Sequence, residues 1–78
     1  MAQIDISTIE KLEKDRVIIH DKVYTTYSIF DKDGKHYVQI DTYGHSDRAL
    51  PGKISQSIQL DRDTAQFVCD LLIKEFEL

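Results

Sequence analysis

The sequence is poor in cysteine and in long apolar runs. Its 78 residues include one cysteine, Cys69, so no disulfide can form within the chain. No apolar run approaches the roughly 20 residues that a membrane-spanning helix needs. The first residues, MAQIDIS, have neither the basic nor the apolar segment of a secretory signal. A lone cysteine without such a signal predicts a cytoplasmic protein.

The sequence also lacks an excess of positive charge. The net charge is −4, with −2 in residues 1–15, +1 in residues 16–60 and −3 in residues 61–78. Proteins that bind duplex DNA usually carry a basic excess, because neutralising phosphates supplies most of their affinity. We therefore expect any nucleic-acid site to be a local patch within residues 16–60.

The motifs of metal and cofactor chemistry are missing as well. His20, His36 and His45 have no metal-ligand spacing with one another or with Cys69. There is no phosphate loop, nucleophile elbow or dinucleotide fingerprint. The sequence therefore predicts no metal site, no cofactor and no enzymatic activity.

Two short runs look like functional motifs but do not fit them. Asp31-Lys32-Asp33-Gly34 resembles part of a calcium loop, yet the last ligand position falls on Ile40 where a glutamate is required. His45-Ser46-Asp47 holds the residue types of a catalytic triad, but consecutive side chains diverge and cannot form a relay. We interpret the first run as a hairpin turn and the second as polar loop residues.

The length favours one domain with a thin core. A chain of this size buries only about 60% of the surface that its unfolded form exposes. Without disulfides or metals, such a fold often gains further burial by self-association. We assign residues 16–78 to a sheet-plus-helix domain and residues 1–15 to an N-terminal arm or short helix. The helical reading rests on a capping box at Ser7 and Glu10, and the other reading places Ile4 and Ile6 in an extended arm.

From Arg16 onward the sequence has the two-residue period of strands. Val17-Ile18-Ile19 is a β-branched run, and residues 23–30 are rich in residues that suit a pleated surface. Residues 35–43 alternate, with Val38, Ile40 and Thr42 facing inward and Tyr37, Gln39, Asp41 and Tyr43 facing outward. In residues 54–60, Ser55, Ser57 and Gln59 form an uncharged polar face opposite Ile58 and Leu60. That polar face suits either hydrogen bonding to a ligand or plain exposure to solvent.

A helix is predicted from the N-cap Asp61 to about Glu77. Its main apolar face contains Ala65, Val68, Cys69, Leu72, Ile73 and Phe76, and a second apolar stripe lies nearly opposite. This second stripe consists of Phe67, Leu71 and Leu78. Since one sheet covers only one face of a helix, we expect either residues 1–15 or a second subunit to cover the stripe.

Three blocks precede or adjoin this helix in a suggestive order: Val38-Gln39-Ile40-Asp41, then Pro51-Gly52-Lys53, then Ile58-Gln59-Leu60. Over residues 23–77 the chain thereby resembles the transcriptional positive cofactor four family. The resemblance implies a four-stranded antiparallel sheet followed by a C-terminal helix, a homodimer with helices at its interface, and single-stranded DNA laid across the sheets. The chain departs from the family in having Thr42-Tyr43 after the strand motif, Phe67 as a displaced helix aromatic, and no basic N-terminal arm.

The expected fold is therefore α+β, with a four-stranded antiparallel β-sheet, a C-terminal α-helix and, in one reading, a short N-terminal helix. The first functional hypothesis is a homodimer that binds single-stranded nucleic acid, with bases stacking on aromatic residues and basic residues meeting phosphates. Its predicted site residues are Lys22, Tyr24, Lys35, Tyr37, Tyr43, Arg48 and Lys53, with Phe30 as a further stacking candidate. The predicted dimer interface is Phe67, Leu71 and Leu78.

Two other hypotheses remain open. The acidic ends of the chain also suit a protein-binding inhibitor or adapter from a phage or mobile element, which would meet a basic protein surface. Alternatively, the chain is a structural homodimer with no ligand of its own, and its tyrosines are packing pairs between strands.

Overall fold

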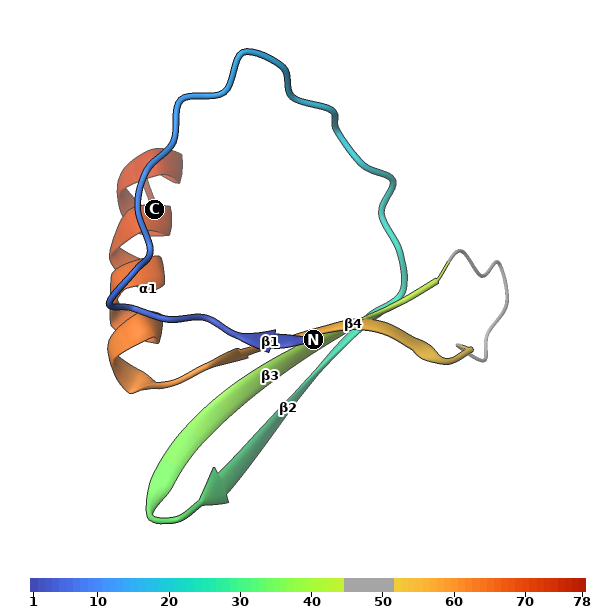
Figure 1. Ribbon diagram of the computed structural model, residues 1–78, viewed down its shortest axis with the longest axis vertical. Helices are drawn as coiled ribbons and strands as arrows, with labels where there is room; N and C mark the ends of the chain where they lie inside the picture. The colour runs from blue at the N-terminus through green and yellow to red at the C-terminus, as the bar shows by residue number, and fades with distance from the viewer. Residues whose placement is uncertain (45–51) are drawn as a thin grey trace.

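A computed structural model describes residues 1–44 and 52–78 (Figure 1). The elements follow the order β1 (Ala2–Gln3), β2 (Thr25–Lys32), β3 (Lys35–Tyr43), β4 (Ile54–Leu60) and α1 (Arg62–Phe76). The strands form one four-stranded sheet in the order β1-β4-β3-β2, and the helix follows it. The predicted α+β fold with a C-terminal helix is confirmed.

The sheet is mixed, so the expectation that it is antiparallel throughout is wrong. β2, β3 and β4 pair antiparallel, whereas β1 pairs parallel with β4 through Ala2–Ile58 and Gln3–Gln59. The Ile4 amide extends this pairing by donating a hydrogen bond of 3.0 Å to the Gln59 carbonyl. A long connection can bring β1 to the sheet in either direction, because no tight turn fixes its orientation.

The turn between β2 and β3 forms where the sequence places it. Asp33 and Gly34 both have positive φ, at 53° and 78°. Two consecutive residues of this kind are typical of a two-residue hairpin turn, whose twist matches that of the strands. The hairpin fixes the register from Lys32–Lys35 to Thr25–Thr42.

The helix also begins and ends near the predicted residues. The Asp61 carboxylate accepts a hydrogen bond of 3.0 Å from the Thr64 amide and caps the first turn. At the other end Glu77 adopts a left-handed conformation, with φ 54°, and its amide donates to the Ile73 carbonyl. These contacts satisfy backbone groups that a helix terminus leaves without partners.

Within the described residues 1–44, no short N-terminal helix forms. Asp5 Oδ1 accepts hydrogen bonds from the Ser7 hydroxyl at 2.7 Å and the Ser7 amide at 2.9 Å. The Thr8 and Ile9 amides both donate to the Asp5 carbonyl. Asp5, rather than Ser7, therefore organises this segment, and it makes a single turn instead of a helix.

The β-branched run at residues 17–19 is not part of the sheet, although its composition suits a strand. Val17, Ile18 and Ile19 lie on a segment without regular structure that joins the N-terminal turn to β2 (Figure 1). Ile19 is 94% exposed. Strand propensity expresses a fit to neighbouring strands, and this segment has none among the described residues.

No apolar side chain among the described residues is buried, and the buried residues are Asp41, Ser57 and Thr64. Thr64 joins α1 to the N-terminal segment, since its hydroxyl donates to the Ile4 carbonyl at 3.4 Å. Large apolar side chains on the sheet and the helix remain in contact with solvent. In the same described part of the chain, no helix has the length and apolar character needed to cross a membrane.

Candidate nucleic-acid interface

The sheet has two chemically different faces, which follow from its register. Residues that pair across strands share a face, and neighbours along a strand alternate between faces. One face, the polar face, carries Thr26, Ser28, Phe30, Tyr37, Gln39, Asp41, Tyr43, Ser57 and Gln59. The opposite, apolar face carries Tyr27, Ile29, Val38, Ile40, Ile58 and Leu60.

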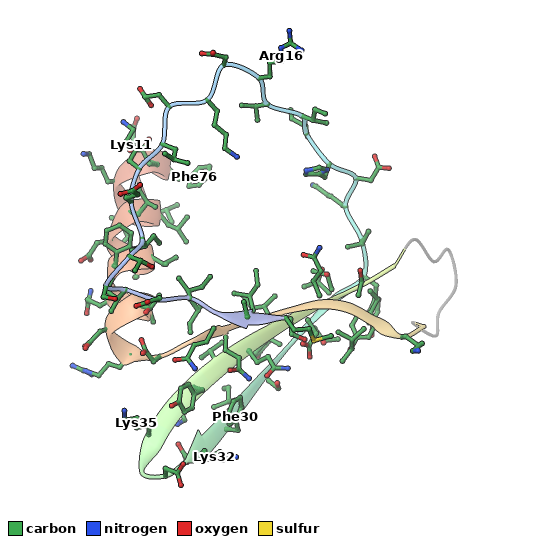
Figure 2. All side chains as sticks on the ribbon, in the orientation of Figure 1. Lys11, Arg16, Phe30, Lys32, Lys35 and Phe76 are labelled. Carbon is green, nitrogen blue, oxygen red and sulfur yellow. The ribbon has the colours of Figure 1, made fainter. Side chains whose placement is uncertain are left out.

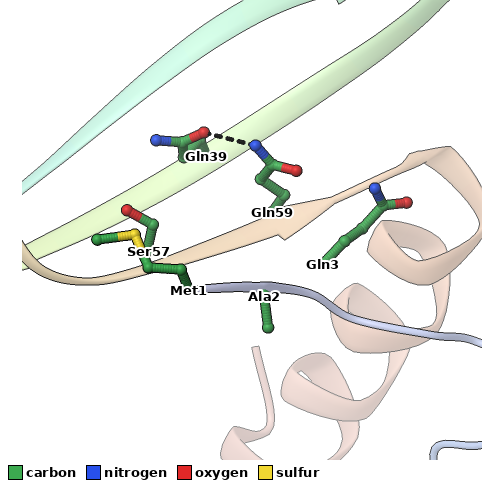
Figure 3. Close-up of a pocket in the computed structure, with 6 residues that line it drawn as sticks. All are labelled: Met1, Ala2, Gln3, Gln39, Ser57 and Gln59. Carbon is green, nitrogen blue, oxygen red and sulfur yellow. Dashed lines mark hydrogen bonds between the residues drawn. The ribbon is translucent and has the colours of Figure 1, made fainter.

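A row of hydrogen bonds crosses the polar face from β4 to β3. The Gln59 side-chain amide donates to Gln39 Oε1 at 2.8 Å (Figure 3). The Gln39 amide in turn donates to Asp41 Oδ1 at 2.9 Å. The Ser57 hydroxyl donates to the same Asp41 oxygen at 2.5 Å. Each donor thus fixes the orientation of the next group, and the row ends at the Asp41 carboxylate, which only accepts.

Asp41 is the centre of this row and is only 7% exposed. A buried carboxylate needs hydrogen-bond donors to replace lost water, and Gln39 and Ser57 supply them. Its negative charge makes the middle of the polar face unfavourable for phosphates. The middle of this face is therefore better suited to the hydrogen-bonding edges of bases or other neutral polar groups.

Two aromatic pairs lie at opposite ends of the row. The Phe30 and Tyr37 rings are stacked, with centroids 5.2 Å apart and an interplanar angle of 20°. The Tyr24 and Tyr43 rings meet edge to face, with centroids 5.4 Å apart and an angle of 70°. The Tyr43 hydroxyl is also within 3.1 Å of Thr26 Oγ1, which holds this ring in place.

The spacing between the pairs follows from the strand that carries them. Tyr37 and Tyr43 are six residues apart on β3, which corresponds to about 20 Å at the usual rise of a strand. Both point to the polar face, because their separation is even. The two pairs thus bracket Gln39 and Asp41 along one line.

A hollow of about 370 Å³ opens beside this line, at the β1 edge of the sheet. It is lined by Met1, Ala2, Gln3, Gln39, Ser57 and Gln59 (Figure 3). The volume falls in the range of about 300–1,000 Å³ that is common for small-ligand sites. Its amide and hydroxyl groups can both donate and accept hydrogen bonds.

The predicted basic residues flank the polar face at both ends and do not form one cluster. Lys35 lies beside the hairpin turn, two residues before Tyr37, and its charge helps to lower the pKa of Asp61. Lys22 lies two residues before Tyr24, and Lys53 directly precedes β4. Arg48 lies outside the described residues, as do His45, Ser46, Asp47 and Pro51.

We compared the chain with models of protein families, with curated proteins and with solved structures. None of them matches it. The resemblance to the transcriptional positive cofactor four family therefore stays a prediction, and the geometry of the sheet carries the functional argument.

The three predicted dimer-interface residues are all exposed. Phe67 and Leu71 lie on α1, and Leu78 follows its last residue. Phe67 is 41% exposed, Leu71 44% and Leu78 82%. The N-terminal segment reaches this side of α1 through the Thr64–Ile4 hydrogen bond, but it leaves much of the second stripe open. Part of the helix surface is thus available to a further partner.

The hydrogen-bonded row as a unit is not predicted from the sequence. The alternation predicts Gln39 and Asp41 on the outward face, and Ser57 and Gln59 on a polar face, but it does not relate the two strands. The missing information was the register that pairs Gln39 with Gln59 and Asp41 with Ser57. A matched polar pattern on two neighbouring strands was the available signal.

No group of three or more potential metal ligands gathers in the described ranges 1–44 and 52–78.

Proposed function

We propose that this protein binds single-stranded nucleic acid across the polar face of its sheet and does so as a homodimer. The observation that carries the proposal is the arrangement of two aromatic pairs about 20 Å apart around a fixed row of hydrogen-bonding side chains. Stacking platforms of this kind bind unpaired bases and tolerate different sequences.

The aromatic pairs would supply affinity, and the row would supply hydrogen bonds. One base stacks on the Phe30–Tyr37 pair and another on the Tyr24–Tyr43 pair. Bases between them meet the amides of Gln39 and Gln59, whose positions are already fixed by hydrogen bonds. Unpaired bases expose the edges that such groups recognise, whereas bases in a duplex do not expose their stacking faces.

The basic residues would position the phosphates at the two ends. Lys35 serves the end of the Phe30–Tyr37 pair, and Lys22 and Lys53 serve the end of the Tyr24–Tyr43 pair. The buried Asp41 carboxylate disfavours phosphates in the middle, so the backbone of the strand lies along the margin of the face. With a net charge of −4, the chain gains little affinity from its overall charge and depends on these local contacts.

Fluorescence anisotropy with a labelled single-stranded oligonucleotide tests the proposal at about 50 mM and about 200 mM salt. Removing a stacking ring by Tyr37→Leu or Tyr24→Leu is expected to weaken binding about tenfold, because a stacked base contributes about 1–3 kcal/mol. Tyr27→Leu is the matched control, since Tyr27 lies on the apolar face. Absence of binding at the lower salt concentration would overturn the proposal, as would equal binding by the Tyr37 and Tyr27 variants.

The competing hypothesis of a protein-binding inhibitor or adapter is supported by the −3 charge of residues 61–78, which include α1. A basic protein surface could contact this charge without involving the polar face. Capture from nuclease-treated lysate distinguishes the two. A single stoichiometric partner whose binding is insensitive to Tyr37→Leu favours the adapter.

A further inference from the structure

The connection between β1 and β2 forms a wide arch, which we define as residues 5–24. It leaves the sheet beside α1, passes along and beyond the helix, and returns to the start of β2 (Figure 1). Near its start, Asp5 organises a single turn. Both ends are tied to the sheet, one by β1 and the other by the hydrogen bond from the Tyr43 amide to the Tyr24 carbonyl.

Apolar side chains border the area that the arch encircles. Val17 and Ile18 on the arch are 75% and 76% exposed. Phe76 points from α1 toward this area, whereas Arg16 points away from it (Figure 2). Apart from this area, at the start of α1, Val38 and Leu60 of the sheet line a hollow of about 370 Å³ together with Ala65 and Cys69 of the helix. Since Val38 and Leu60 belong to the apolar face, this hollow places α1 on the same side of the sheet as that face.

The surface area of the single chain is larger than a compact fold of its mass would have. Its accessible surface is 7285 Å², whereas a compact monomer of 9.1 kDa exposes about 4,900 Å². The radius of gyration is 14.7 Å, against about 11.5 Å for a compact domain of this length. The chain therefore exposes roughly 2,400 Å² more than a self-sufficient fold of its mass.

We propose that α1 of a second copy occupies the area encircled by the arch, so that each chain's arch closes over its partner's helix. The inserted helix packs against α1 and the apolar face of the first chain. This arrangement deepens the homodimer of the proposed function but does not require a nucleic acid. Contacts of this kind are isologous: the arch of one copy meets α1 of the other, and the reverse.

The surface that lacks a partner suits this occupant. A helix of 15 residues is about 22 Å long and about 10–12 Å wide, and the chain measures 40 × 36 × 24 Å. If each copy lost its excess of roughly 2,400 Å², the dimer would bury about 4,800 Å² in total, which is typical of obligate homodimers.

The chemistry of α1 explains why a second copy is the fitting partner. The helix carries apolar side chains on two sides, with Phe67 and Leu71 on one and Ile73 and Phe76 on the other. All four are more than 40% exposed, so the helix can contact its own chain and a partner at the same time. Val17-Ile18-Ile19 has no charge that could attract phosphates, which argues against nucleic acid as the occupant.

Solution mass and unfolding test this inference on the full chain without oligonucleotide. We expect a dimer by light scattering and a urea midpoint that rises with protein concentration, because folding and association are coupled. Val17 is exposed in the single chain, so the charge introduced by Val17→Asp stays in water there and should not destabilise the monomer. The charge weakens association only if a partner covers Val17. It is expected to raise the dimer dissociation constant by about tenfold or more. Arg16→Asp is the neighbouring control and should leave the dissociation constant nearly unchanged.

Mixing isotope-labelled and unlabelled copies tests the exchange of arches directly. Filtered nuclear Overhauser effects between the methyl groups of residues 17–19 and the Phe67 or Phe76 ring of the other copy would support it. A folded monomer with a concentration-independent midpoint would overturn the inference, and so would a dimer whose arch contacts arise within one copy. Anisotropy on the same samples separates the two proposals: a dimer with these contacts that fails to bind oligonucleotide refutes the proposed function alone.

Discussion

The Ser57 hydroxyl donates a hydrogen bond of 2.5 Å to the Asp41 carboxylate, and the two residues are direct partners across β4 and β3. Both side chains are buried on a sheet in which none of the described apolar residues is buried. Order on the polar face thus comes from hydrogen bonding between strands. A face that is already organised loses little conformational freedom when a ligand binds.

The first prediction concerns this bond. Ser57→Ala removes a donor from a buried carboxylate and is expected to lower the free energy of unfolding by about 1–3 kcal/mol. Urea unfolding at fixed protein concentration measures the change. Ser55→Ala is the control, since Ser55 lies in the same strand but is exposed. Equal midpoints for the two variants would show that the Ser57–Asp41 bond contributes little.

The second prediction concerns the salt dependence of oligonucleotide binding. If Lys35 and Lys53 each neutralise one phosphate, Lys35→Ala and Lys53→Ala should each reduce the slope of log affinity against log salt by about 0.7. Lys74→Ala makes the same charge change in the last turn of α1 and should leave the slope unchanged. Three identical slopes would place the phosphates elsewhere.

The third prediction concerns the hairpin turn. Gly34 has φ 78°, and a Cβ added there would meet nothing within 4 Å, so Gly34→Ala acts through backbone strain alone. We expect a loss of about 1 kcal/mol in the free energy of unfolding. Gly44→Ala also adds a methyl group in open space, but without positive φ, and should be neutral or slightly stabilising. The same loss in both variants would argue against strain at Gly34.

The fourth prediction concerns the acid sensitivity of α1. The hydrogen bonds from Thr64, backbone first, and the charge of Lys35 hold the pKa of Asp61 below its ordinary value of 3.8. The ionised cap therefore stabilises the folded state above that value, and its contribution is lost as pH falls through the lower folded-state pKa. Asp61→Asn keeps a capping oxygen and removes the titration.

Far-ultraviolet circular dichroism from neutral to acidic pH measures this effect. The Asp61→Asn variant should lose less helix on acidification than the unaltered chain, and Asp61→Ala should have less helix at every pH. Asp63→Asn removes an acidic residue of the same first turn that is not the N-cap. Identical acid curves for Asp61→Asn and the unaltered chain would contradict the assigned role of Asp61.

Local signals predicted the hairpin, the later strands and the helix. The turn at Gly34 needs positive φ, Asp61 provides a capping carboxylate, and the alternation in residues 35–43 specifies which side chains share a face. Each of these features depends on residues that are close together in the sequence. The same alternation correctly grouped Tyr37, Gln39, Asp41 and Tyr43.

The features that the sequence did not predict depend on distant residues. β1 has two residues, Ala2 and Gln3, and its strand conformation depends on pairing with Ile58 and Gln59. The burial of Asp41 requires Ser57 opposite it, which only the register of β3 and β4 determines. Val17-Ile18-Ile19 has strand propensity without a strand partner in its own chain, so composition alone misassigned it.

The pairing of Ala2 with Ile58 also bears on how the chain assembles during synthesis. The β2–β3 hairpin joins neighbouring residues and can form as soon as it leaves the ribosome, whereas the parallel pairing must wait until β4 emerges. β1 is thus translated before β2 and β3 but enters the sheet after they have paired. Between the emergence of β4 and its pairing with β1, the outer edge of β4 is open, and the nascent chain is most vulnerable to edge-to-edge aggregation at this stage.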